Sequence, residues 1–126
     1  MIKPCRVSEA ELLVLKAIWR QPGSTALQII ESMSPATNWS PPTIKTLLNR
    51  LLHKKALFFK QTGKSYLYFP AFSENEFQKA EADSFVERVF DGALSPMLAH
   101  FAKTRRLTKD DLQELTKILR KGGEAP

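Results

Sequence analysis

One segment decides the fold: Ser40-Pro41-Pro42-Thr43-Ile44-Lys45-Thr46-Leu47-Leu48-Asn49-Arg50-Leu51-Leu52-His53-Lys54-Lys55. Its apolar residues recur at the spacing of one helical face: Ile44, Leu47, Leu48, Leu51 and Leu52. Ser40 is a suitable N-cap, and the prolines after it fit a first helical turn, where a missing N–H costs nothing. The segment therefore predicts an amphipathic helix that begins directly after Ser40.

The opposite face of this helix carries no acidic side chain and consists of Pro42, Lys45, Thr46, Asn49, Arg50 and His53. Lys, Arg, Asn and Thr side chains donate hydrogen bonds to phosphates and read base edges in the major groove of DNA. A basic helix face is more often just a solvated surface, so the rest of the chain must decide between the two interpretations.

The positive charge is concentrated in the N-terminal half. The 126 residues carry a formal net charge of +6, but residues 1–70 hold ten Lys/Arg and three acids, whereas residues 71–126 hold nine Lys/Arg and ten acids. No Asp or Glu lies between Glu31 and Glu74. This distribution is expected of a polyanion-binding module joined to a neutral one, although chance clustering in a basic protein would give the same pattern.

Two further helices are predicted before the central one, the first over residues 9–20 and a short second one that Ser24 or Thr25 caps and Ser34-Pro35 ends. Each begins with a capping box, in which a Ser or Thr N-cap is followed three residues later by Glu or Gln. The two boxes are Ser8 with Glu11 and Thr25 with Gln28. Two helices before the central one match the order of a helix-turn-helix with a leading support helix.

After the central helix the hydrophobic period changes to that of strands. Residues 57–61 and 65–69 are rich in aromatic residues, and Gly63 supplies a turn between them, which predicts a hairpin. A helix-turn-helix followed by such a hairpin is a winged helix. Lys60 and Lys64 would lie on the wing near phosphates or the minor groove, or they would protect a strand edge from aggregation. We expect most of the aromatic side chains of the hairpin to lie in the core.

The second half predicts three amphipathic helices. The first spans residues 74–90 and ends at Gly92, the second is capped by Ser95-Pro96, and the third is capped by Thr108. Three short helices contain too few residues to bury a sufficient core of their own. Their apolar stripes therefore need a partner, and the simplest partner is a second copy of the chain. A two-fold dimer would place two reading helices on a palindromic DNA site.

The predicted fold is therefore mainly α with a small β-hairpin wing. A winged helix-turn-helix DNA-binding domain covers residues 1–71, and an α-helical dimerisation domain covers residues 72–126. Neither an enzyme nor a cofactor is indicated, because the chain lacks a glycine-rich phosphate loop, an H-E-x-x-H motif and a nucleophile elbow. A metal or Cys-His site would require the fold to gather Cys5, His53 and His100.

Cysteine usage and hydropathy bear on the compartment. The single cysteine, Cys5, excludes an internal disulfide and fits a reducing interior. No apolar run approaches the length of a membrane span, and the N-terminus has no apolar signal core. We therefore expect a cytoplasmic protein that does not insert into membranes.

Three stretches resemble the penicillinase repressors of the BlaI/MecI/CopY group. They are N-W-S-P-P-T-I-K-T-L-L-N-R-L-L-H-K-K-A-L at 38–57, G-K-S-Y-L-Y-F-P at 63–70 and A-E-A-D-S-F-V-E-R-V-F-D-G-A-L at 80–94. The resemblance covers nearly the whole chain. It implies a bacterial winged-helix repressor that dimerises through its C-terminal helices and controls β-lactamase, penicillin-binding-protein or, in some members, copper-transport genes. In the β-lactam branch it also implies a membrane sensor-protease system and cleavage of the repressor at an Asn-Phe bond.

Two positions depart from the family pattern. The position that resembles the cleavage bond reads His100-Phe101, so Asn is replaced by His while Phe is kept. The copper branch carries a Cys-x-Cys motif near its C-terminus, and this chain has no cysteine after Cys5. The alternatives are a regulator of the same family with another inducer, such as a metal or small ligand, and a winged helix that contacts only proteins.

The candidate sites follow from these interpretations. Thr43, Lys45, Thr46 and Asn49 are predicted to face base edges or nearby phosphates, and Arg50, Lys60 and Lys64 to hold phosphates of double-stranded DNA. The full predicted DNA-binding set is Ser40, Pro42, Thr43, Lys45, Thr46, Asn49, Arg50, Lys60 and Lys64. The predicted dimer interface is Phe77, Phe85, Val89, Leu98, Phe101, Leu112, Leu115 and Leu119.

Overall fold

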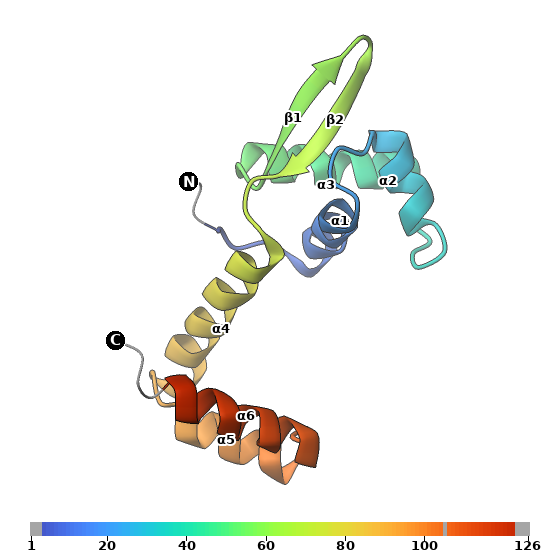
Figure 1. The fold of residues 1–126 in the computed structure, drawn as a ribbon. Coiled ribbons are helices and arrows are strands. Elements are labelled where there is room, and N and C mark those ends of the chain that lie inside the picture. The colour runs from blue at the N-terminus through green and yellow to red at the C-terminus, as the bar shows by residue number, and fades with distance from the viewer. Residues whose placement is uncertain (1–3, 105, 123–126) are drawn as a thin grey trace. The chain divides into compact units, whose positions relative to one another are not determined.

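The structure, a computed structural model, describes residues 4–104 and 106–122 (Figure 1). The elements follow in the order α1 (Glu9–Arg20), α2 (Ala26–Met33), α3 (Pro41–His53), β1 (Leu57–Thr62), β2 (Ser65–Pro70), α4 (Glu74–Phe90), α5 (Leu94–Lys103) and α6 (Lys109–Gly122). The predicted class, helices with one two-stranded antiparallel hairpin, is confirmed. None of the helices in the described ranges is both long enough and apolar enough to cross a membrane.

The chain divides into two compact units, an N-terminal unit Met1–Glu81 and a C-terminal unit Ala82–Pro126. The division falls inside α4, ten residues after the position at which the sequence predicts the DNA-binding domain to end. That boundary, at residue 71, concerns function and stays a prediction. Each unit is described by itself below.

The predicted helix starts of the N-terminal unit are confirmed. The hydroxyls of Ser8 and Thr25 accept hydrogen bonds from backbone N–H groups three residues on, and the side chains of Glu11 and Gln28 accept in return from the N-cap N–H groups. Ser40 caps α3, with the two prolines in its first turn. These contacts satisfy N–H groups that would otherwise have no partner at a helix start.

The core of the N-terminal unit is built around the apolar face of α3. Ile44, Leu48 and Leu51 are almost completely buried, together with Leu15 and Ile18 of α1. α2 and the base of the hairpin add further members of the same cluster: Ile29, Met33, Ala56, Leu57 and Tyr68. Because these side chains are removed from water together, the orientation of α3 about its own axis is determined by the core.

The hairpin is held to the helices by a short backbone bridge. Phe59 pairs with Tyr68 in the antiparallel register, and the segment before α2 pairs with β2 in turn. There the Gly23 N–H donates to the Tyr68 carbonyl at 2.8 Å, and the Tyr68 N–H donates to the Ser24 carbonyl at 2.9 Å. The pairing gives the base of β2 partners on both sides, which the sequence did not predict.

The prediction that most hairpin aromatics lie in the core is wrong. Tyr68 is buried, but Phe58, Phe59 and Tyr66 are exposed large side chains. Figure 1 shows the reason, since the hairpin projects beyond α1, α2 and α3 and only its base lies against them. The exposed rings pack on each other instead, for example Phe59 on Tyr66 with ring centroids 4.6 Å apart.

One buried ion pair links α1 to the end of α3. The Glu11 side chain is 3% exposed, and its Oε1 lies 2.5 Å from Nζ of Lys54, whose side chain is 38% exposed. Burial alone would raise the pKa of the Glu11 carboxyl. The hydrogen bond and charge of Lys54, with hydrogen bonds from Ser8, outweigh this effect, so the pKa lies below its ordinary value of 4.5. The pair therefore favours the folded state wherever Glu11 is ionised.

An aromatic cluster fixes the start of α4 on the N-terminal unit. The Trp19 indole N–H donates to the Phe72 carbonyl at 2.9 Å, and the Phe77 ring lies 5.5 Å from Trp19 and 6.0 Å from Phe72, centroid to centroid. Phe77 is 5% exposed. Its assignment to the dimer interface is therefore corrected, because its surface is already buried within the chain.

The helix ends of the C-terminal unit agree with the sequence except at α5. Gly92, with φ of 83°, follows the end of α4, and Thr108 caps α6 through reciprocal hydrogen bonds with Asp111. α5 begins one residue before Ser95, and its N-cap is Ala93 without a side-chain hydrogen bond. The predicted cap at Ser95-Pro96 is wrong, because proline is accepted within the first turn and does not need to follow the cap directly.

Glu11→Gln is expected to lower the free energy of unfolding by about 1–2 kcal/mol at neutral pH, because the capping hydrogen bond survives but the charge that meets Lys54 is lost. Glu11 has a lowered pKa in the folded state, so its contribution is present above its ordinary pKa of 4.5 and is lost as the pH falls below it. Denaturant unfolding at several pH values measures the difference. Glu9→Gln, the loss of an exposed charge in the same turn, is the control; equal effects of both variants at all pH values would contradict the prediction.

Gly23→Ala is expected to destabilise the protein more than Gly63→Ala. Both glycines have positive φ, 82° and 62°, which costs an alanine about 1 kcal/mol or more. A Cβ at Gly23 would also lie 3.3 Å from the Phe69 ring, whereas nothing lies within 4 Å of one at Gly63. Urea unfolding of the two variants gives the comparison, and a larger loss for Gly63→Ala would refute the close-contact argument.

Candidate nucleic-acid interface

The face of α3 that points away from the core carries the predicted DNA-binding residues. Ser40, Pro42, Thr43, Lys45, Thr46, Asn49 and Arg50 are all exposed. They alternate in sequence with Ile44, Leu47, Leu48 and Leu51, which are buried. A helix can present the first set only while it buries the second, so the packing of α3 positions this surface.

Hydroxyl groups at the start of α3 are engaged by the helix itself. The Ser40 Oγ accepts from the Thr43 N–H at 3.4 Å and lies 3.0 Å from the Thr43 hydroxyl. The Thr46 hydroxyl donates to the Pro42 carbonyl at 3.0 Å. Thr46 can therefore offer acceptor lone pairs and a methyl group to a partner, whereas its hydroxyl proton is already used.

Lys45, Asn49 and Arg50 supply the uncommitted donors of this face. None of these three side chains has a hydrogen-bond partner or an acidic neighbour within ion-pair distance among the residues that the structure describes. Their charged and amide groups are thus free to meet phosphate oxygens and base edges.

A shallow concavity lies where the start of α1 meets the end of α3. It has a volume of about 600 Å³ and is lined by Ser8, Glu11, Thr46, Asn49, Arg50, His53 and Lys54. Lys54 is tied here to Glu11 and to the Arg6 carbonyl, at 3.3 Å from the latter. Arg50 is therefore the cation in this concavity whose charge is not compensated by a neighbouring carboxylate.

Glu11 and Lys54 are members of this surface that the sequence did not predict. The capping box placed Glu11 in the first turn of α1, but nothing local indicates that it reaches a lysine 43 residues away. No pattern within one helix could have identified this contact, because it depends on how two helices pack.

The two wing lysines occupy different places on the hairpin. Lys60 lies on β1 opposite Leu67, with its Nζ 5.2 Å from the centroid of the Phe69 ring. Lys64 follows Gly63 in the turn, and Figure 1 shows this tip pointing away from α3. Both side chains are exposed and therefore accessible to solvent.

The C-terminal unit exposes most of the residues predicted to mediate dimerisation. Phe85, Val89, Leu98, Leu112 and Leu119 are between 38% and 69% exposed, and Phe101 and Leu115 are partly buried. Among residues 82–104 and 106–121, Val86 is the only buried hydrophobic side chain. His100 and Phe101 lie within α5, so the predicted cleavage bond belongs to a helix.

The residues considered for a metal site do not form one in the part of the chain that the structure describes. Cys5 is a free, half-buried thiol packed against the N-terminal core, and His53 is exposed at the end of α3. Within the described ranges, no group of three or more His, Cys, Asp or Glu side chains is arranged to hold a metal ion.

Comparison with known proteins connects this geometry to a family. The penicillinase repressor family model matches residues 7–121. The chain is 34% identical to the penicillinase repressor of Bacillus licheniformis over 119 residues, which cover 94% of this chain and 93% of that one. It is 30% identical to the methicillin resistance regulatory protein MecI of Staphylococcus aureus (strain N315), again over 94% of this chain and 97% of the relative.

Two solved structures resemble part of the chain. The DNA-binding domain of the repressor BlaI in solution is 37% identical, with a TM-score of 0.53, over 60% of this chain and 93% of that one. Bacillus licheniformis BlaI in its monomeric form, in complex with the blaP half-operator, is also 37% identical, with a TM-score of 0.52 over the same shares. The relatives are repressors and regulators by name, and the predicted resemblance is confirmed. The chain belongs to the penicillinase repressor family.

Proposed function

We propose that this protein is a homodimeric transcriptional repressor that binds palindromic operator DNA. The observation that carries the proposal is the acid-free, exposed face of α3, whose opposite face is buried in the core. A relative whose structure matches 60% of this chain is described in complex with a half-operator, which supports DNA as the partner here. The proposed mechanism is occlusion of a promoter.

The proposed docking places α3 in the major groove. Lys45, Thr46 and Asn49 would meet base edges or nearby phosphates, and Arg50 would hold the backbone. Lys60 and Lys64 on the wing would contact flanking phosphates. Lys54 contributes less in this arrangement, because Glu11 already compensates its charge.

The proposed dimer is supported by the apolar surface of the C-terminal unit. Its helices carry large exposed side chains, among them Val89, Leu112 and Leu119, but they bury almost none of their own. A second copy of the chain that covers this surface would remove apolar area from water, which stabilises the dimer. Two-fold symmetry would then set two α3 helices on half-sites about one helical turn, or a multiple of it, apart.

The proposed targets are genes for β-lactamases, penicillin-binding proteins or related resistance functions, in the cytoplasm where chromosomal DNA is found. The names of the relatives, a penicillinase repressor and a methicillin resistance regulator, support this assignment. Derepression is proposed to occur by cleavage at His100-Phe101 through a membrane sensor-protease system. Because this bond lies in α5, a protease must first reach a locally unfolded helix. α5 lacks a side-chain cap and has no buried residue within its own chain, so in a chain that is not paired it can open at a low cost in free energy.

The DNA-binding proposal is tested by selection from random duplexes followed by anisotropy titrations at several salt concentrations. We expect enrichment of an inverted repeat and affinity that falls steeply with salt. Lys45→Ala with Arg50→Ala should lower the salt slope by about 2 and weaken binding to all sequences. Lys109→Gln with Arg120→Gln, the same charge loss on exposed positions of α6, is the control. Absence of any enriched duplex, or affinity indifferent to salt, would overturn the proposal.

Leu112→Asp with Leu119→Asp is expected to weaken dimerisation by about 100-fold or more, because two charges would be buried without partners. Analytical ultracentrifugation should then find the 14.3 kDa chain instead of twice this mass. Leu27→Asp, at an apolar position of α2 that is 63% exposed, should leave the association unchanged. A native chain that sediments as a monomer at micromolar concentration would contradict the proposed dimer.

Cleavage is tested by intact-mass measurement of the repressor from host cells exposed to a β-lactam. We expect an N-terminal fragment that ends at His100. A chain truncated after His100 should lose the dimer and bind the operator more weakly, since α6 and its exposed Leu112, Ile118 and Leu119 are gone. Induction of the target gene while only the full-length chain is present would show that another signal releases the repressor.

A further inference from the structure

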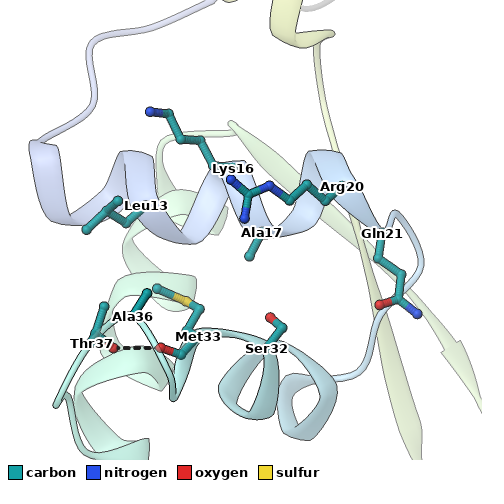
Figure 2. A pocket seen from close by; sticks show the side chains of 9 residues that line it. All are labelled: Leu13, Lys16, Ala17, Arg20, Gln21, Ser32, Met33, Ala36 and Thr37. Atoms are coloured by element: carbon teal, nitrogen blue, oxygen red, sulfur yellow. Dashed lines mark hydrogen bonds between the residues drawn. The ribbon is translucent and has the colours of Figure 1, made fainter.

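A groove between α1 and α2 lies on the N-terminal unit outside the proposed DNA-binding face. Its volume is about 410 Å³, and Figure 2 shows side chains of α1 on one side and of α2 and the following turn on the other. The lining residues of α1 include Leu13, Lys16 and Arg20, which are exposed and spaced three and four residues apart on one helix face. The residues of α1 that pack in the core, such as Leu15 and Ile18, are different ones.

The groove combines an apolar floor with uncompensated positive charge. Leu13, Ala17 and Met33 supply the apolar surface, and Lys16 and Arg20 supply two cations at the α1 rim, with the Lys16 ammonium directed away from α2 in Figure 2. No Asp or Glu lines the groove, and within the described ranges neither cation has an acidic partner within 4.0 Å. The one acid of α2, Glu31, is not a lining residue.

The hydroxyl groups on the α2 side of the groove have already used their protons. The Ser32 hydroxyl donates to the Ile29 carbonyl at 2.8 Å, and the Thr37 hydroxyl donates to the Met33 carbonyl at 3.2 Å, the bond drawn in Figure 2. The charged donors that remain in the groove are those of Lys16 and Arg20. A ligand that satisfies them must bring a negatively charged acceptor.

We propose that this groove binds a small amphipathic carboxylate. Its carboxylate would meet Lys16 and Arg20, and its apolar body would lie on Leu13, Ala17 and Met33. The volume is in the range of small-molecule sites, and the combination of a mainly apolar lining with a few charged groups is typical of them. The ligand would contact α1, α2 and the turn that leads toward α3 without covering the exposed face of α3.

The site is tested by ¹H–¹⁵N NMR titration of the full chain with 2-naphthoate, a flat carboxylate, and with 2-naphthamide, its neutral counterpart. Naphthoate is expected to shift the amide signals of residues 13–21 and 32–37. Naphthamide should bind about ten-fold or more weakly, because it lacks the charge that the two cations require.

Three variants separate charge from shape. Lys16→Gln with Arg20→Gln should weaken naphthoate binding about ten-fold, and Lys109→Gln with Arg120→Gln, with the same loss of charge on α6, should leave it unchanged. Ala36→Phe keeps every charge and places a bulky ring at an exposed lining position, so it should also weaken binding.

Several results would overturn the proposal. They are equal binding of naphthoate and naphthamide, unchanged binding by the Lys16 and Arg20 double variant, and shifts confined to α3 or to the C-terminal helices. Shifts at residues 13–21 with a Glu-rich peptide but not with naphthoate would assign the groove to a protein partner instead. Because these measurements contain no DNA, their outcome is independent of the proposed repressor function.

Discussion

The burial of one face of α3 is the constraint on which the other features of the N-terminal unit depend. Ile44, Leu47, Leu48 and Leu51 are removed from water by contact with α1, α2 and the base of the hairpin. Rotation of the helix about its axis would expose these side chains, each at a cost of about 1.5–3 kcal/mol, and would bury cations in their place. The packing of the core therefore determines the direction in which the basic face of α3 points, and no further contact is needed to orient it.

Local patterns predicted this part of the molecule well. Each capping box, the prolines after Ser40 and the change of hydrophobic period near Leu57 act over a few residues, and the structure contains the corresponding helices and strands. The exposed positions of α3 also followed from spacing alone. These predictions succeeded because the free energy of a cap or an amphipathic face depends on neighbours in the same element.

The contacts between distant elements could not be predicted in this way. The bridge from Ser24 to Tyr68 and the ion pair of Glu11 with Lys54 each join residues more than 40 positions apart. Phe77 belongs to an apolar stripe typical of an interface, yet Trp19 and Phe72 cover it. Apolar periodicity indicates that a side chain will be buried but does not identify the surface that buries it.

The two units differ in how far each satisfies its own hydrophobic surface. The N-terminal unit has a continuous cluster that runs from Val14 to Phe77, whereas in the described part of the C-terminal unit only Val86 is buried. Charge is also unevenly distributed, since the excess of cations belongs to residues 1–70. The half that is complete as a folded unit is thus the half with the excess of positive charge, and the half with the exposed apolar surface carries almost no net charge.

The Trp19 indole gives the protein an intrinsic fluorescent reporter. Its N–H is bonded to the Phe72 carbonyl and its ring lies against Phe77, the residue that secures the first turns of α4. Any event that pulls the beginning of α4 from the N-terminal unit would transfer this chromophore toward water and move its emission to longer wavelength. The second tryptophan, Trp39, directly precedes Ser40, the N-cap of α3. Replacing Trp39 with phenylalanine would therefore leave Trp19 as the single fluorescent reporter of the contact between α1 and the start of α4.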